Sequence, residues 1–222
     1  MSLIAASFIA IIEAILMMNI LLRHIVILLF LLIVGTVLPQ ASGTYGAPTP
    51  VVSVATIKYS NGAYRGNIDN NGRRNGHGEY IWTDGHVYEG DWLADKMHGK
   101  GKFILADGRV YDGDWLEDKM HGKGKFTYTS GNVYDGEFLD NLRNGKGKYT
   151  FPNGDVFVGE YKDDLRNGKG KEFWADGSLY DGEFLGGLRN GLGTETDMWK
   201  LFRYQGEWSN DKMHGKGVMS LF

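Results

Sequence analysis

The sequence predicts an all-β protein in which two-stranded hairpins stack into a repeat array, with a separate apolar segment at the N-terminus. Glycine makes up 33 of the 222 residues, about twice its usual share of ~7%, and all but Gly35, Gly43 and Gly46 follow residue 60. A pattern of about 23 residues then recurs to the end of the chain, and such a period is typical of stacked repeats. Each copy contains two short runs of aromatic and β-branched residues, as strands do.

This composition excludes several classes of protein. Glycine inside a helix costs roughly 1 kcal/mol relative to alanine, so the glycine-rich part does not fit a helical bundle or a helix-rich α/β enzyme. The net charge of −3 argues against nucleic-acid binding, which requires a basic surplus to neutralise phosphates. Because the chain has no cysteine, disulfides, zinc–thiolate sites and a cysteine nucleophile are excluded as well.

Residues 1–43 are predicted to form an apolar helix that serves as a signal peptide or a membrane anchor. Two apolar stretches, 3–22 and 25–38, are separated only by Arg23 and His24. The second stretch would be about 21 Å long as a helix, short of the ~30 Å hydrocarbon core of a bilayer. With Arg23 before it and small residues up to Gly43 after it, it fits a cleaved signal peptide. The alternative is an uncleaved anchor that uses some or all of residues 3–38.

The same segment suggests where the rest of the chain lies. Arg23 is the only basic residue near the apolar stretches, and it precedes the second of them. The positive-inside rule then places the C-terminal part outside the cytoplasm, unless the two stretches form a helical hairpin. We therefore expect a membrane-associated or secreted protein. Residues 44–57 carry no charge and contain two prolines, which predicts a linker before the array.

The array is predicted to span residues 58–222. In its second unit, Tyr88-Glu-Gly-Asp-Trp92 would form one strand and Lys96–Phe103 the next, with Asp-Gly or Asn-Gly turns between units. Alternation places Tyr88 and Trp92 on one face and the acidic residues between them on the other, where lysines of the second strand would pair with them. The predicted unit starts are Tyr64, Tyr88, Tyr111, Tyr134, Phe157, Tyr180 and Tyr204.

These units resemble the MORN (membrane occupation and recognition nexus) repeat, whose unit runs approximately Tyr-X-Gly-X-Trp, a short loop, Gly-X-Gly and a strand that closes at Gly-X-X-Tyr. The resemblance covers residues 64–222 in seven units, and it implies an elongated, single-layer antiparallel sheet of successive hairpins. The terminal units depart from the pattern: Ile68 replaces tryptophan in the first, and the seventh ends at Phe222 before its second strand would be complete. An open C-terminal edge could pair two copies in a homodimer.

No catalytic centre is expected in the array. His98, His121 and His214 recur at one position, but neighbouring units lie about 9.6 Å apart, too far for these imidazoles to share a zinc ion with ligands at ~2 Å. Asparagine replaces them in other units, which favours a turn residue in the left-handed conformation. The sequence has no P-loop, dinucleotide fingerprint or nucleophile elbow. We therefore expect no enzyme activity, no metal and no cofactor.

The aromatic face is predicted to bind a protein partner. Two rows of aromatic rings flanked by glycines would form a concave strip that accepts a helix or an extended segment. Alternatively, the rings pack on one another in place of a core. The residues assigned to partner binding are Tyr88, Trp92, Tyr111, Trp115, Tyr134, Phe138, Phe157 and Tyr161.

Two other functions remain open at this stage. Basic residues in the first turn of each unit could form a stripe that binds phospholipid headgroups and tethers the array to a second membrane, although aspartates occupy the same turns. The residues assigned to lipid binding are Lys96, Lys119, Arg143 and Arg166. The array could also be an accessory subunit of a cytoskeletal or ciliary assembly.

Overall fold

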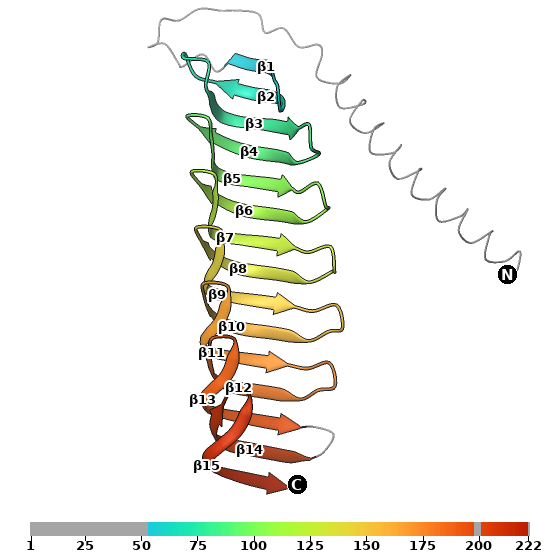
Figure 1. The fold of residues 1–222 in the computed structure, drawn as a ribbon, viewed down its shortest axis with the longest axis vertical. Coiled ribbons are helices and arrows are strands. Elements are labelled where there is room, and N and C mark those ends of the chain that lie inside the picture. Colours follow the sequence, from blue (N-terminus) through green and yellow to red (C-terminus); the bar gives the residue numbers. More distant parts are fainter. Residues whose placement is uncertain (1–52, 198–200, 222) are drawn as a thin grey trace, which may run out of the picture. The chain divides into compact units, whose positions relative to one another are not determined.

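The protein's repeat array is a single antiparallel sheet. The structure, a computed structural model, describes residues 53–197 and 201–221, so the predicted N-terminal helix lies outside the described residues. The described residues form fifteen strands whose order in the sheet is their order in the chain (Figure 1). Each strand therefore pairs only with the strands before and after it in sequence. The all-β, single-layer sheet expected from the repeat is confirmed for this part of the chain.

Each unit contributes a shorter first strand and a longer second strand. The shorter strands are built around Tyr-X-Gly, and the longer ones contain Gly-X-Gly. The bounds are β1 (Ser53–Tyr59), β2 (Gly62–Ile68), β3 (Arg74–Trp82), β4 (Val87–Leu93), β5 (Lys96–Ile104), β6 (Val110–Leu116), β7 (Lys119–Thr127), β8 (Val133–Leu139), β9 (Leu142–Thr150), β10 (Val156–Lys162), β11 (Leu165–Phe173), β12 (Leu179–Leu185), β13 (Leu188–Asp197), β14 (Phe202–Ser209) and β15 (Lys212–Leu221).

The sheet differs from the prediction at both ends. Residues 53–57 were expected in the linker, but they belong to β1, which pairs with β2 from Ser53 opposite Ile68 onward. A stretch without charged residues fits a strand as well as it fits a linker. Ile57 of this strand packs against the core. The last strand was expected to be incomplete, yet β15 pairs with β14 as far as Leu221.

Two kinds of turn connect the strands. From the second unit onward, the turn within a unit has two residues, such as Ala94 and Asp95, and both have positive φ (49° and 71°), as a type I′ hairpin requires. In the first unit a longer loop connects Ile68 to Arg74. Between units the chain makes a longer loop in which the Gly108 amide donates to the carbonyl of Leu105. This loop contains the Asp-Gly pair, as the sequence predicted.

A β-bulge follows each tight turn and corrects one prediction. His98 lies opposite Asp91, but Gly101 lies opposite Gly90, so β5 contains extra residues at this point. The left-handed residue is Gly99, with φ of 60°, and not His98. Glycine adopts this conformation without a steric penalty, which is why it follows the histidine or asparagine in every unit. The expectation that the histidine itself is left-handed is therefore wrong.

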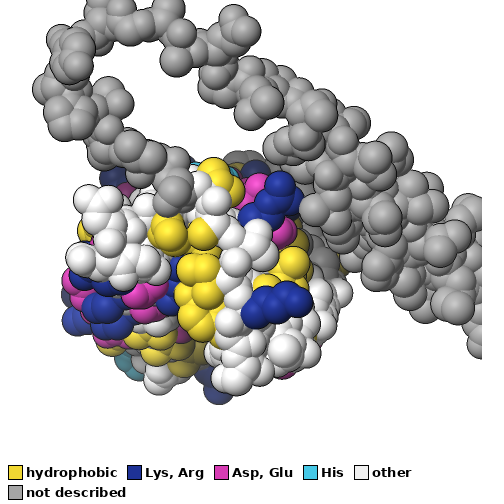
Figure 2. Space-filling model, turned by 90° about the horizontal axis from the view of Figure 1, so that it is seen from above, with side chains coloured by type: hydrophobic (Ala, Val, Ile, Leu, Met, Phe, Trp, Pro, Cys, Tyr) yellow, Lys and Arg dark blue, Asp and Glu magenta, His cyan; other side chains and the backbone are white. Residues whose placement is uncertain are grey.

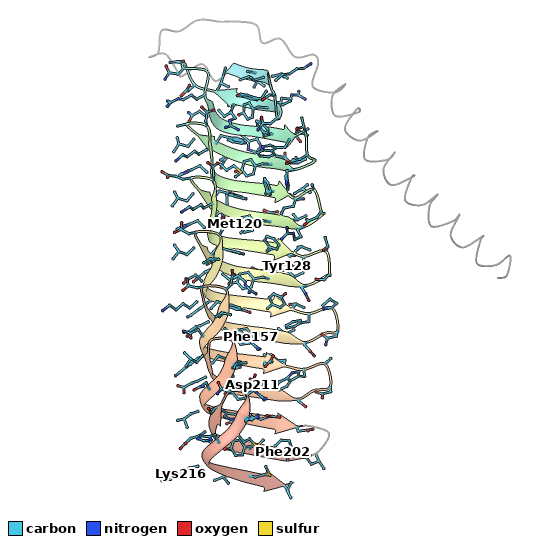
Figure 3. The ribbon with its side chains drawn as sticks, viewed as in Figure 1. Met120, Tyr128, Phe157, Phe202, Asp211 and Lys216 are labelled. Carbon is cyan, nitrogen blue, oxygen red and sulfur yellow. The ribbon has the colours of Figure 1, made fainter. Side chains whose placement is uncertain are left out.

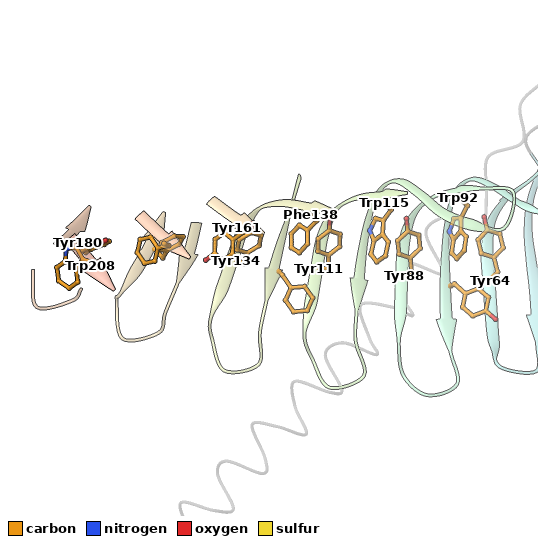
Figure 4. Packing of buried hydrophobic residues seen from close by; sticks show 14 of the residues in the cluster. Tyr64, Tyr88, Trp92, Tyr111, Trp115, Tyr134, Phe138, Tyr161, Tyr180 and Trp208 are labelled. Carbon is orange, nitrogen blue, oxygen red and sulfur yellow. The ribbon is translucent and has the colours of Figure 1, made fainter. Parts of the chain in front are cut away.

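Aromatic rings on one side of the sheet form the core. We call this side, which carries Tyr88, Gly90 and Trp92, the inner face, and the opposite side the outer face. The Tyr88 ring meets Trp92 of its own unit and Trp115 of the next unit edge to face, at centroid distances of 5.0 and 5.4 Å, and this arrangement repeats along the array (Figure 4). The ring lies directly over Gly101, where a Cβ would collide with it. The glycines thus form a floor on which the rings pack.

Candidate interaction surfaces

The eight residues predicted to bind a partner form the core of the array. The structure brings all eight together on the inner face, where their exposed fractions range from 0% for Tyr88 and Tyr134 to 6% for Trp115. Their hydroxyl and indole groups are also engaged, since Tyr88 Oη donates to the carbonyl of Asp91 and Trp92 Nε1 to that of Gly78. A partner on this face would therefore contact the side chains beside these rings. The full set is Tyr88, Trp92, Tyr111, Trp115, Tyr134, Phe138, Phe157 and Tyr161.

A second group of inner-face side chains is only partly buried, and we call it the aromatic strip. The rings of Trp82 and Phe103 lie 5.6 Å apart, and those of Tyr128 and Tyr149 6.0 Å apart. Met120 lies near the tight-turn end of β7, and Tyr128 follows the opposite end of that strand (Figure 3). The members of the strip are Trp82, Met97, Phe103, Met120, Tyr128 and Tyr149.

The sequence analysis did not assign these residues to a site, although a signal for them was present. Phe103 follows Gly101 by two residues, so it had to share the face of the glycine floor. Met97 carries no such signal because the bulge at Gly99 lies between it and Gly101. Its face depends on its pairing with Trp92 across the tight turn, which only the structure supplies.

The aromatic strip ends in a pocket at its N-terminal side. The pocket has a volume of about 350 Å³. Arg74 forms part of its wall, with its guanidinium 4.1 Å from the centre of the Trp92 ring and its Nη2 donating to the carbonyl of Asp95 at 2.6 Å. The pocket therefore combines aromatic walls with carboxylate groups. Its lining residues are Tyr59, Asn61, Arg74, Tyr80, Trp82, Trp92, Asp95, Met97 and Asp118.

Two kinds of unit alternate in blocks along the array. The second strand begins with Lys-Met-His at residues 96, 119 and 212, and with Leu-Arg-Asn at residues 142, 165 and 188. Neighbouring residues in a strand point to opposite faces. Exchanging Lys-Met for Leu-Arg therefore moves the positive charge from the outer face to the inner face, and the apolar side chain in the opposite direction.

On the inner face, the arginines of the Leu-Arg-Asn units lie over the aromatic core. The Arg143 guanidinium lies 5.1 Å from the Tyr161 ring centre and 5.5 Å from that of Tyr149, and its Nε donates to Asp164 at 3.0 Å. The equivalent Arg166 and Arg189 pair with Glu172 and Glu195, respectively. In the first Lys-Met-His units, methionines occupy the same positions.

The four residues assigned to lipid binding do not form one row. Lys96 and Lys119 point outward and pair with Glu117 and Asp140. Arg143 and Arg166 occupy the next position along their strands, and both lie over inner-face rings. These four residues therefore do not form the single basic stripe on which the alternative of lipid binding rested. The lysines are the first residues of their strands and the arginines are the second. A shift of one residue along a strand places a side chain on the opposite face.

The rest of the outer face carries a ladder of opposite charges. Lys100 pairs with Asp114, and Lys171 with Asp181. These ion pairs join the second strand of one unit to the first strand of the next, whereas the sequence predicted pairs within a unit. Burial alone would raise the pKa of Asp114, but its hydrogen bond with Lys100 and the amide of Lys123 lower it overall. Figure 2, a view along the array from its β1 end, shows dark blue and magenta side chains side by side on its left flank, and others on the right.

Two further searches concern only the residues that the structure describes. Within residues 53–197 and 201–221, no group of three or more His, Asp or Glu side chains is arranged to hold a metal ion. None of these residues belongs to a helix with the length and hydropathy of a membrane span.

Comparison with solved structures finds distant similarity to two domains. The TCP domain of Drosophila melanogaster SAS-4 (dCPAP), solved with a proline-rich motif of Ana2 (dSTIL), is 16% identical, with coverage of 72% of this chain and 92% of that one and a TM-score of 0.38. The G-box domain of the microcephaly protein CPAP is 12% identical, with coverage of 76% and 98% and a TM-score of 0.40. At these scores the similarity says nothing about the partners of this chain.

Sequence comparison is more decisive. No curated protein matches the chain, but seven stretches match the MORN repeat, and from the second onward each begins at a predicted unit start. They are residues 70–87, 88–108, 111–133, 134–156, 157–179, 180–197 and 204–221. Together they cover more than half of the 222 residues and overlap the strands β3 to β15, so the chain belongs to the MORN repeat family.

Proposed function

We propose that this chain is a non-enzymatic scaffold that binds a protein partner through the aromatic strip of its inner face. The observation that carries the proposal is the partial exposure of the strip residues, which lie against a core that is itself almost fully buried. The core already holds the sheet together, so the strip offers apolar surface that the fold leaves uncovered. Aromatic residues and methionine are enriched at the centres of protein interfaces.

The shape of the strip favours a partner segment that lies along the array. Equivalent residues of neighbouring units are two strands, or about 9.6 Å, apart, and this distance corresponds to six or seven residues of α-helix. An amphipathic helix with one large apolar residue per two turns would therefore meet the strip in register. The pocket beside Trp82, with its volume of about 350 Å³, is large enough to take one side chain of that helix as an anchor.

The chain itself supplies a matched variant for testing this proposal. Met97→Arg/Met120→Arg gives two inner-face positions the residue that Arg143, Arg166 and Arg189 already provide in other units, so the sheet should be retained. It places charge in the apolar strip and should abolish binding. Lys96→Leu/Lys119→Leu is the control, because it alters the adjacent positions on the outer face and should leave binding intact.

Binding would be measured by photo-crosslinking in the native cells. A photoreactive amino acid at Phe103 samples the strip, and the same group at Lys125 samples the outer face. We expect a defined protein adduct at Phe103 that the Met97→Arg/Met120→Arg variant loses. Equal adducts at both positions, or an adduct that survives this variant, would contradict the proposal.

A further inference from the structure

The pocket at the N-terminal side of the aromatic strip contains an aspartate without a cation. Asp118 lines this pocket and accepts a hydrogen bond from the backbone amide of Met97 at 2.8 Å. Among the residues that the structure describes, no lysine, arginine or histidine forms an ion pair with Asp118. Arg74 in the same pocket is already paired with Asp95 at 3.1 Å. These two charges cancel, so Asp118 leaves the pocket with an excess of negative charge.

The preceding unit shows which group satisfies an aspartate at this position. Arg74 and Asp95 are the equivalents of Met97 and Asp118, because in each pair the first residue's amide donates to Oδ1 of the aspartate in the next tight turn. The Arg74 guanidinium lies 4.1 Å from the centre of the Trp92 ring and pairs with Asp95. A guanidinium held between an aromatic ring and this aspartate is therefore an arrangement that the fold itself uses.

The other units either repeat this arrangement or lack both of its charges. The ion pairs that repeat it are Arg143–Asp164 and Arg189–Asp211. In the third unit, Met120 stands at the arginine position and its amide donates to Asn141 in place of an aspartate. Gly187 replaces the aspartate after Arg166, which pairs with Glu172 instead. Among the described pairs, only the second unit keeps the aspartate without the arginine.

We propose that this pocket binds an arginine side chain of the protein partner, which supplies the guanidinium that the second unit lacks. This inference rests on the proposed function, because it identifies the anchor that enters the pocket beside the aromatic strip. The guanidinium would pair with Asp118, since its planar fork matches a carboxylate. Tyr59 and Trp82, which line the pocket and are not fully buried, offer aromatic rings on which it can stack.

The chemistry of the pocket disfavours other anchors. An apolar side chain would cover the Asp118 carboxylate and leave it unpaired, which costs free energy. A phosphate or carboxylate would be repelled by the excess negative charge. A lysine ammonium could pair with Asp118, but it is a compact charge that cannot make two parallel hydrogen bonds to the carboxylate while lying flat on a ring.

The experiment measures the binding of a blocked arginine, N-acetyl-arginine amide, to the full chain. Labelling with 5-fluorotryptophan gives one fluorine NMR signal for each of the six tryptophans, and the Trp82→Phe variant identifies the signal of Trp82. We expect blocked arginine to shift this signal in a saturable way. Blocked citrulline, which has the shape of arginine without the charge, and blocked lysine should each bind at least fivefold more weakly. A missing response to arginine, or equal affinity for either control, would overturn the proposal.

Two variants of the tight turn test the role of Asp118. Asp118→Asn copies Asn141, which accepts the same backbone hydrogen bond from Met120, so the turn should be retained while the affinity for blocked arginine falls at least fivefold. Glu117→Gln is the matched control, because it removes a charge from the same turn, but one that pairs with Lys96 on the outer face. It should leave the affinity within twofold. Equal losses in both variants would indicate unspecific attraction and overturn the proposal.

A third variant supplies the missing group within the chain. Met97→Arg places a guanidinium beside Asp118, as Arg74 lies beside Asp95, and should abolish the binding of blocked arginine. Saturable binding that survives in Met97→Arg would place the ligand elsewhere and would also overturn the proposal.

Photo-crosslinking at Phe103 separates this inference from the proposed function. We expect Asp118→Asn to reduce the protein adduct at Phe103. If Asp118→Asn leaves the adduct unchanged while Met97→Arg/Met120→Arg abolishes it, the arginine anchor is wrong and the proposed function stands. The absence of any Phe103 adduct in the unaltered chain would instead contradict the proposed function, whatever the result with blocked arginine.

Discussion

The Lys-Met-His and Leu-Arg-Asn units share one backbone but present different surfaces. In both, a backbone amide at the start of the second strand donates a hydrogen bond to an aspartate in the tight turn of the next unit. The Met97 amide donates to Asp118 at 2.8 Å, and the Arg143 amide to Asp164 at 3.0 Å. Both have the same glycine floor and a bulge at the same place, although φ of the bulge glycine is 60° at Gly99 and 97° at Gly145. They differ in which face carries the charge. In this single-layer sheet, units that differ at these positions thus carry their charge on opposite faces while the strand order stays the same.

The exchange is accommodated because arginine and methionine both cover the same rings. Arg143 lies over aromatic faces and bonds with Asp164, an arrangement in which cation–π contact contributes about 0.5–2 kcal/mol. Met97 and Met120 pack against the core without any charge. A flexible apolar side chain suits the same irregular space.

The largest expected effect tests what the two kinds of unit have in common. Gly124→Ala, in a Lys-Met-His unit, and Gly147→Ala, in a Leu-Arg-Asn unit, would each place a Cβ inside the ring of the tyrosine above, Tyr111 or Tyr134. We expect each to lower the free energy of unfolding by about 3 kcal/mol, with the loss localised by hydrogen exchange to the altered unit. If only one of the two variants is destabilised, the glycine floor is not a shared feature.

Much of this framework could be predicted from the sequence. The recurrence of Tyr88-X-Gly90-X-Trp92 gave the strand, its face and the unit length, because alternation is fixed within an uninterrupted strand. The faces of Lys96 and Met97 could not be predicted. A tight turn precedes these residues and a bulge follows them, and each interrupts the alternation of side chains between the two faces. The extent of burial could not be predicted either. The sequence places both Trp115 and Phe103 on the inner face, but Trp115 is buried because it packs onto Tyr88, a contact that only the structure shows.

The next effect concerns pH and compares units by their tyrosines. Burial raises the pKa of Tyr64 and Tyr180 to about 12, despite the opposing influence of Arg74 and Arg189, and it also raises the pKa of Tyr88 and Tyr111. The unfolded chain loses these protons near pH 10, whereas the folded array retains them. Stability should therefore be complete below pH 10 and fall as the pH rises toward 12.

Circular dichroism during denaturant unfolding at a series of alkaline pH values would measure this loss. Tyr88→Phe is the matched variant, because Phe157 occupies the same position in the fifth unit. It should reduce the slope of stability against pH by removing one titrating group. An unchanged slope would mean that Tyr88 does not contribute to the alkaline transition.

The smallest effect tests the exchange itself. Arg143→Met removes the ion pair with Asp164 and the contacts with the Tyr149 and Tyr161 rings, so we expect a loss of about 1–2 kcal/mol. The reverse change, Met97→Arg, should be nearly neutral because Asp118 occupies the position that Asp164 has beside Arg143. Thermal unfolding of both variants gives the comparison, and a large loss in Met97→Arg would show that the two kinds of unit are not interchangeable.

The meander order of the fifteen strands has a consequence for how such a chain can grow. Because no strand crosses over another, a whole 23-residue segment can be inserted or deleted while every remaining pair keeps its partner, and stability changes by one local increment. Each insertion lengthens the array by about 9.6 Å. The distance between surfaces that lie on different units can therefore be changed, in fixed steps, by duplication or loss of the units between them.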